Sequence, residues 1–248
     1  MLDWQVMTTA KLFIVESIVI IAVLAGVAYA YPHTHRSTAK AVKNPDEITY
    51  LPLGDSYTIG QSVSEDERWP NQLVNTLSNI GKHVKIIDNP SVTGYTTQNL
   101  IDRELPLVAK EKPDFVTIQI GVNDYVQGVD TATFTKNLDY IITTVQSKLS
   151  KPENLMLVTI PDYGKTPTGA QFGSPESSEA GVKAFNAIIT SLGAKYNIPV
   201  ADVFSVSQQV VKDPSLIAPD GLHPSGKQYA AWTEIIAATL RAHQLPQR

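Results

Sequence analysis

The chain has 248 residues, contains no cysteine and carries a formal net charge of −4 at pH 7. The absence of cysteine excludes disulfides, thiolate metal sites and a cysteine nucleophile, and the acidic balance argues against a nucleic-acid partner, which usually needs a basic face. A hydrophobic fraction of 43% and a charged fraction of 18% indicate that most of the chain is globular and can bury one core.

The N-terminal region differs from the rest in composition. Residues 12–31 are almost entirely apolar, and Ala28-Tyr29-Ala30 resembles a signal-peptidase cleavage site. The stretch has the length of a signal-peptide core or of a short membrane span. Residues 1–31 are therefore interpreted either as a cleaved signal peptide or as an uncleaved membrane anchor, and both alternatives predict export.

The next stretch, residues 32–46, is polar and basic, and is predicted to be a flexible linker. It contains His33 and His35, but no second cluster of ligands stands nearby, so a solvated linker is favoured over a metal site. Residues 47–248 then form the folded domain. Export would place this domain outside the cytoplasm, as a secreted or periplasmic protein or one held at the membrane by the N-terminal segment.

Strands and helices are predicted to alternate through the folded domain. Strands are expected at residues 48–53, 83–88, 115–120, 155–160 and 198–203, and helices at 70–79, 96–110, 133–149, 180–195 and from about 224 onward. Pro106 is expected to bend the second helix, and residues 161–178, rich in Pro, Gly, Ser and Thr, are predicted to be a long loop. This alternation predicts an α/β fold with a central parallel sheet of about five strands and helices on both faces.

Polar residues and glycines follow these strands or precede the last helix. Ser56 follows the first strand, Gly94 lies in the loop after the second, and Asn123 follows the third. Asp220 and His223 stand just before the final helix. Because the carboxyl ends of parallel strands meet at one edge of a sheet, these residues are expected to build one site.

The residue types in this set suit attack on an ester. Ser56 is the candidate nucleophile, His223 the base, and Asp220 the carboxylate that orients the imidazole. The Ser56 N–H, the Gly94 N–H and the Asn123 side-chain amide are candidate donors to the oxyanion that such an attack forms.

Four short blocks resemble the SGNH, or GDSL-type, hydrolase superfamily. The blocks are Gly54-Asp55-Ser56, Gly94, Gly121-Val122-Asn123-Asp124 and Asp220-Gly221-Leu222-His223. They occur in the family's order, and the resemblance extends over residues 47–240. It implies a flavodoxin-like three-layer sandwich, a catalytic domain over residues 47–248, ester hydrolysis by a serine, and no cofactor or metal. Tyr57 stands where the family commonly has leucine.

Other residues stand beside the nucleophile or just after a predicted strand. Tyr57, Asp162 and Tyr163 are candidates for substrate binding. The remaining conspicuous residues are interpreted as structural or simply exposed: Asp55, Asp124, Trp69 and His83.

The expected substrate is a small-molecule, lipid or glycan ester. A lysophospholipase-like or general acyl esterase is favoured, because no sugar-binding module is attached. A triglyceride lipase is disfavoured, because the sequence has no long apolar segment that would serve as a lid. Two alternatives stay open: a non-catalytic surface module that binds glycan or lipid in the same cleft, and an acyltransferase in which a sugar hydroxyl replaces water. The sequence does not predict the oligomeric state.

Overall fold

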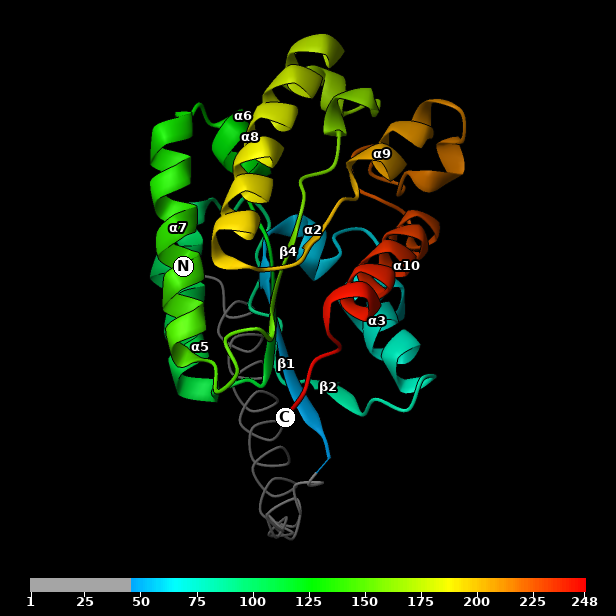
Figure 1. The fold of residues 1–248 in the computed structure, drawn as a ribbon. Helices are drawn as coiled ribbons and strands as arrows, with labels where there is room; N and C mark the ends of the chain where they lie inside the picture. The colour runs from blue at the N-terminus through cyan, green and yellow to red at the C-terminus, as the bar shows by residue number, and fades with distance from the viewer. Residues whose placement is uncertain (1–45) are drawn as a thin grey trace, which may run out of the picture. The chain divides into compact units, whose positions relative to one another are not determined.

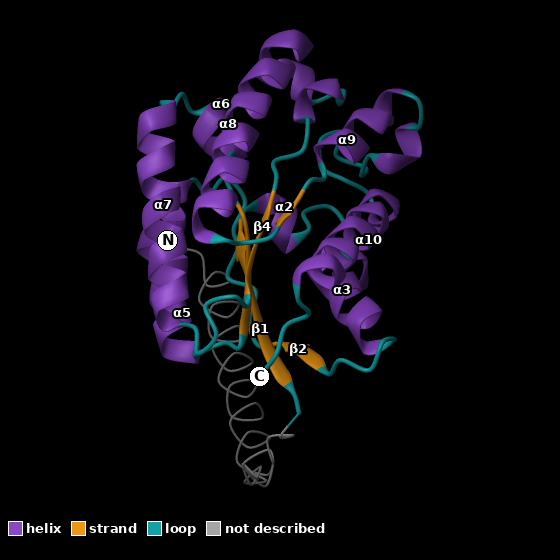
Figure 2. Cartoon of the chain, in the orientation of Figure 1, coloured by secondary structure: helices purple, strands orange, loops and turns teal. Residues whose placement is uncertain are grey.

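A computed structural model describes residues 46–248 of the chain, and the predictions for residues 1–31 and for nearly all of the linker lie outside the described residues. Five parallel strands form one sheet in the order β2-β1-β3-β4-β5 (Figures 1 and 2). The strands are β1 (Ile48–Gly54), β2 (Val84–Ile86), β3 (Phe115–Gln119), β4 (Leu155–Val158) and β5 (Val200–Ala201). This is the flavodoxin order, so the predicted fold class is confirmed.

Helices cover both faces of the sheet (Figure 1). On one face lie α5 (Leu105–Glu111), α7 (Thr131–Lys148) and α8 (Pro175–Tyr196), and on the other lie α3 (Trp69–Ser78) and α10 (Gly226–His243). Every residue of β1 and β3 is buried, as expected of central strands covered on both sides. Between residues 46 and 248, no helix combines the length and the apolar character that a membrane crossing requires.

Short helical turns were not predicted from the sequence. The α-helical ones are α2 (Ser56–Ile59), α4 (Thr97–Asn99), α6 (Val122–Val126) and α9 (Phe204–Ser207). The 3₁₀ turns are Glu65–Glu67, Tyr163–Lys165, Gly169–Phe172, Gln208–Val211 and Pro214–Leu216. Elements this short contain no repeating apolar stripe, so periodicity cannot reveal them.

Two predicted helices differ in detail. The predicted helix 96–110 is α4, a π-helical turn at Leu100–Glu104, and then α5 with a proline in its first turn, so the expected irregularity at Pro106 is present. Helix α8 begins at Pro175, inside the predicted loop 161–178. Ser174 caps it by accepting a hydrogen bond from the Ser177 N–H at 3.2 Å, and a proline suits the first helical position.

Candidate active site

Ser56 is placed by the junction of β1 and α2. The strand ends at Gly54, where an added Cβ would lie 2.3 Å from the Gln119 carbonyl oxygen, so only glycine fits. Asp55 caps the following helix by accepting the Tyr57 N–H at 3.0 Å. Ser56 is the first residue of that helix, and its own N–H has no hydrogen-bond partner in the described part of the chain. The turn therefore holds a serine whose hydroxyl and N–H are both available to a ligand.

His223 and Asp220 are joined by a short hydrogen bond, 2.6 Å between Nδ1 and Oδ2. Ser62 donates to the same carboxylate oxygen at 2.7 Å, and the N–H groups of Leu222 and His223 donate to the other oxygen at 2.9 and 3.0 Å. Partial burial acts to raise the pKa of Asp220, but these hydrogen bonds outweigh it and hold that pKa well below its ordinary value. Asp220 is therefore an anion at neutral pH, aimed at the imidazole.

Four of the predicted catalytic and oxyanion residues line one cavity of about 220 Å³, whereas Asp220 lies outside its lining and reaches the site through its bond to His223. Its lining comes from segments far apart in the sequence. The lining residues are Ser56, Tyr57, Gln61, Thr93, Gly94, Val122, Asn123, Val126, Tyr163, Phe172, Leu222 and His223. Ser56 and His223, both only 5% exposed, share this cavity with Gly94 and Asn123.

Asn123 and Gly94 both line the cavity, and both carry N–H donors. The Asn123 amide, on α6, donates to the Tyr95 carbonyl at 3.0 Å and makes a longer contact of 3.4 Å with Asp55 Oδ2. Gly94 adopts φ +85°, a left-handed conformation that favours glycine. Its N–H has no acceptor within residues 46–248.

The acidic neighbours Asp55 and Asp124 have structural contacts, as expected. Asp124 accepts hydrogen bonds from both the N–H and the hydroxyl of Thr97, which ties α6 to α4. Burial raises the pKa of Asp55 to about 7. The hydrogen bond from the Tyr57 N–H lowers this pKa, and repulsion from Asp124 raises it further.

Glu104 is a buried acid that the sequence interpretation missed. It is fully buried, and its Oε2 accepts the Gly54 N–H at 2.9 Å while Oε1 has no partner among the described residues. Burial raises the pKa of Glu104 to about 8, although the hydrogen bond from Gly54 opposes this. A signal was present: Glu104 stands one helical turn after Leu100 and one before Val108, both buried, and so falls on an apolar stripe.

Glu104→Gln is expected to flatten the pH dependence of stability. The folded-state pKa of about 8 exceeds the ordinary 4.5, so the folded protein favours the protonated carboxyl. The stability that this proton contributes is complete below about pH 4.5 and is lost as the pH rises through about 8. Relative to the variant, the wild type should lose about 2–4 kcal/mol of unfolding free energy across this window.

Urea unfolding at pH 5, 6, 7 and 8 measures this difference. Glu153→Gln, at an exposed position, is the matched control and should follow the wild type. Parallel pH curves for the wild type and Glu104→Gln would contradict the protonated assignment.

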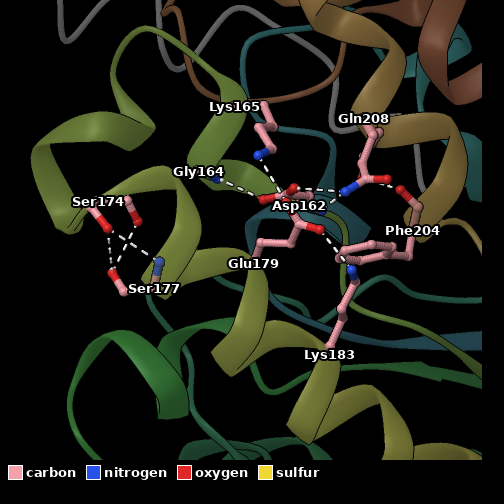
Figure 3. Close-up of polar contacts among 10 residues, drawn as sticks. Asp162, Gly164, Lys165, Ser174, Ser177, Glu179, Lys183, Phe204 and Gln208 are labelled. Carbon is pink, nitrogen blue, oxygen red and sulfur yellow. Dashed lines mark hydrogen bonds and ion pairs between the residues drawn. The ribbon is translucent and has the colours of Figure 1, made fainter.

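Of the three candidate substrate-binding residues, Tyr57 and Tyr163 line the cavity and Asp162 does not. The Asp162 carboxylate accepts the Gly164 N–H and the Gln208 side-chain amide, each at 3.2 Å, and the Asp162 N–H donates to Ser207 Oγ at 2.6 Å. Figure 3 shows this carboxylate lying between the two segments that carry Gly164 and Gln208. Asp162 thus fastens the segment after β4 to the α9 region.

Two further residues lie as expected. Trp69 is fully buried and donates from Nε1 to Gln119 Oε1 at 3.0 Å, and His83 is exposed. No group of three or more His, Asp or Glu side chains in the described structure is arranged to hold a metal ion.

A five-stranded sheet of flavodoxin order, with a serine after its first strand and a histidine–aspartate pair in the same site, defines a class of α/β hydrolases. The chain belongs to the GDSL-like lipase/acylhydrolase family, whose model matches residues 53–231. The resemblance inferred from the four sequence blocks is thereby confirmed. The protein is an enzyme of a family that hydrolyses esters.

Curated relatives agree with this assignment, and a solved structure agrees with the fold. The arylesterase of Vibrio mimicus is 27% identical over 193 residues, which cover 78% of this chain and 88% of the relative. Thioesterase 1/protease 1/lysophospholipase L1 of Escherichia coli K12 is 26% identical over 178 residues, covering 71% and 76%. The crystal structure of TesA matches with a TM-score of 0.63 at 23% identity, over 78% of this chain and 98% of that one, which supports the fold.

Proposed function

We propose that the protein is a serine esterase that hydrolyses carboxylic esters through an acyl-enzyme, with Ser56 as nucleophile, His223 as base and Asp220 as the orienting carboxylate. One observation carries the proposal. Ser56 and His223 line the same cavity, and the imidazole Nδ1 lies 2.6 Å from an ionised Asp220.

The chemistry follows from this arrangement. The ionised Asp220 carboxylate accepts a hydrogen bond from Nδ1–H, so in the neutral imidazole Nε2 carries the lone pair and acts as the base. Ser56 Oγ forms a bond to the ester carbonyl carbon while its proton passes to Nε2. The tetrahedral intermediate then expels the alcohol, which takes that proton. Water attacks the acyl-enzyme in the same way and releases the acid and Ser56.

Three donors support the oxyanion. The N–H groups of Ser56 and Gly94 are without intramolecular acceptors in residues 46–248, so donating to a ligand costs them no existing bond. The Asn123 amide would exchange its long 3.4 Å contact with Asp55 for the oxyanion while keeping its bond to Tyr95. Each such donor typically contributes about 10²–10³ in kcat.

The cavity favours acyl esters of short or medium length. At about 220 Å³ it is small, and much of its wall is apolar: Val122, Val126, Phe172 and Leu222. An arylesterase and a lysophospholipase among the relatives are consistent with an acyl group in this space. The alcohol part of the ester can belong to a lipid, an aryl compound or a glycan.

Hydrolysis of p-nitrophenyl acetate, butyrate, octanoate and palmitate tests the proposal. We expect kcat/KM to peak at butyrate or octanoate and to fall at least about tenfold for palmitate, because the cavity is too small to bury that chain. Folded protein that turns over none of these esters, and that a fluorophosphonate probe does not label, would favour a non-catalytic binding module. Formation of a new ester when an alcohol is added would instead identify an acyltransferase.

A further inference from the structure

An aromatic side chain lies against the imidazole of His223. The ring of Tyr57, one residue after Ser56, is centred 5.5 Å from the His223 ring at an interplanar angle of 60°. Behind Tyr57 lies Trp232, at 6.1 Å and 50°, and Tyr229 meets Trp232 edge-on at 5.2 Å and 87°. Tyr57 is 4% exposed and the other two are fully buried. The imidazole therefore faces a fixed aromatic wall.

The side chain of His223 has little other support, because the residue lies outside the described helices and strands. The residue lies in the loop between the Pro214–Leu216 turn and α10, and its backbone is held there by the Ala218 N–H, which donates to its carbonyl at 2.8 Å. Within the described part of the chain, its side chain makes one hydrogen bond, to Asp220. A single hydrogen bond at Nδ1 leaves the ring free to tilt, and so fixes the position of Nε2 poorly.

We propose that Tyr57 is a positioning residue for His223: the Tyr57 ring blocks this tilt and holds the imidazole in the cavity that Ser56 also lines. The proposal rests on the esterase function proposed above. Ser56 and Tyr57 are consecutive residues of α2, and Asp55 holds the Tyr57 N–H at 3.0 Å. The nucleophile and the surface that orients its base are thus parts of one rigid turn.

The role belongs to the ring and not to the hydroxyl. The hydroxyl makes no hydrogen bond to any residue from 46 to 248. Burial, with nearby Asp55, Tyr163, Asp220 and Asp162, raises the pKa of Tyr57 well above its ordinary value, so the phenol stays neutral. Phenylalanine at position 57 should therefore preserve the positioning of His223. Leucine should also fit among the buried apolar neighbours of Tyr57 but lacks the planar surface.

Steady-state kinetics on p-nitrophenyl butyrate test the role. Tyr57→Leu is expected to lower kcat about tenfold, because the alignment of the imidazole is lost. Tyr57→Phe should stay within about twofold of the wild type. Tyr140→Leu, at an exposed position on α7, is the matched control and should change nothing.

A second measurement does not depend on activity. The proton shared by His223 Nδ1 and Asp220 should give a downfield NMR signal that Asp220→Asn removes. We expect the wild type and Tyr57→Phe to keep this signal, and Tyr57→Leu to lose it to exchange with water as the ring loosens.

The outcomes separate the two proposals. An unchanged signal and unchanged kcat in Tyr57→Leu would overturn the positioning role, and equal losses in Tyr57→Phe and Tyr57→Leu would assign the effect to the hydroxyl instead. A wild type without ester turnover, whose signal still disappears in Tyr57→Leu, would refute the esterase function alone.

Discussion

Ser56→Ala is expected to lower kcat for p-nitrophenyl butyrate by at least about 10⁴-fold. The variant removes the only atom proposed to bond to the acyl carbon, while the cavity and the N–H groups around it stay in place. The side chain is small and 5% exposed, and α2 is capped by Asp55, so the fold should be unaffected. Thermal unfolding of the variant should match the wild type.

The matched control is Ser147→Ala, an exposed serine on α7 that should keep full activity. A fluorophosphonate probe supplies a second reading. It should label the wild type on the peptide that contains Ser56, and it should not label the variant. Ester turnover that persists in Ser56→Ala would contradict the proposal that Ser56 is the nucleophile.

His223→Ala is expected to cost about as much as Ser56→Ala, about 10⁴-fold or more in kcat, because a neutral serine hydroxyl is a weak nucleophile. The Ser56→Ala/His223→Ala double variant should be no slower than either single variant, since the two side chains act as one unit. Added imidazole should restore part of the activity of His223→Ala and none of that of Ser56→Ala, because only the former keeps its nucleophile.

His243→Ala provides the control, at an exposed histidine in the last turn of α10. It should leave kcat unchanged. A His223→Ala variant within tenfold of the wild type would assign the base to another group, and losses that multiply in the double variant would show that the two residues act independently.

The sequence predicted those features that repeat or that stand at fixed places relative to strands. Alternating strands and helices define a parallel sheet, and a parallel sheet brings its carboxyl-end loops together. This rule groups Ser56, Gly94, Asn123 and His223, and all four line one cavity. The His223–Asp220 pair was also predictable, because the two lie in one tight loop.

Contacts made by side chains from unrelated segments could not be predicted. Ser62 donates to Asp220 from a polar loop whose path carries no sequence signal. Asp162 was expected at the cavity because it follows a strand, yet its carboxylate is bound by Gly164 and Gln208. Gln208 belongs to a short turn without periodicity, so no pattern marked it as a partner.

The order in which the site is assembled follows from where its parts lie in the chain. The nucleophile is the first residue of α2, directly after the first strand. The base lies just before α10, which packs against α3, a helix formed from the early part of the domain. A nascent chain would therefore expose Ser56 long before it holds a base. Since such non-local contacts form late in folding, the protein should be synthesised as an inert hydrolase that becomes competent only when its C-terminal helix docks.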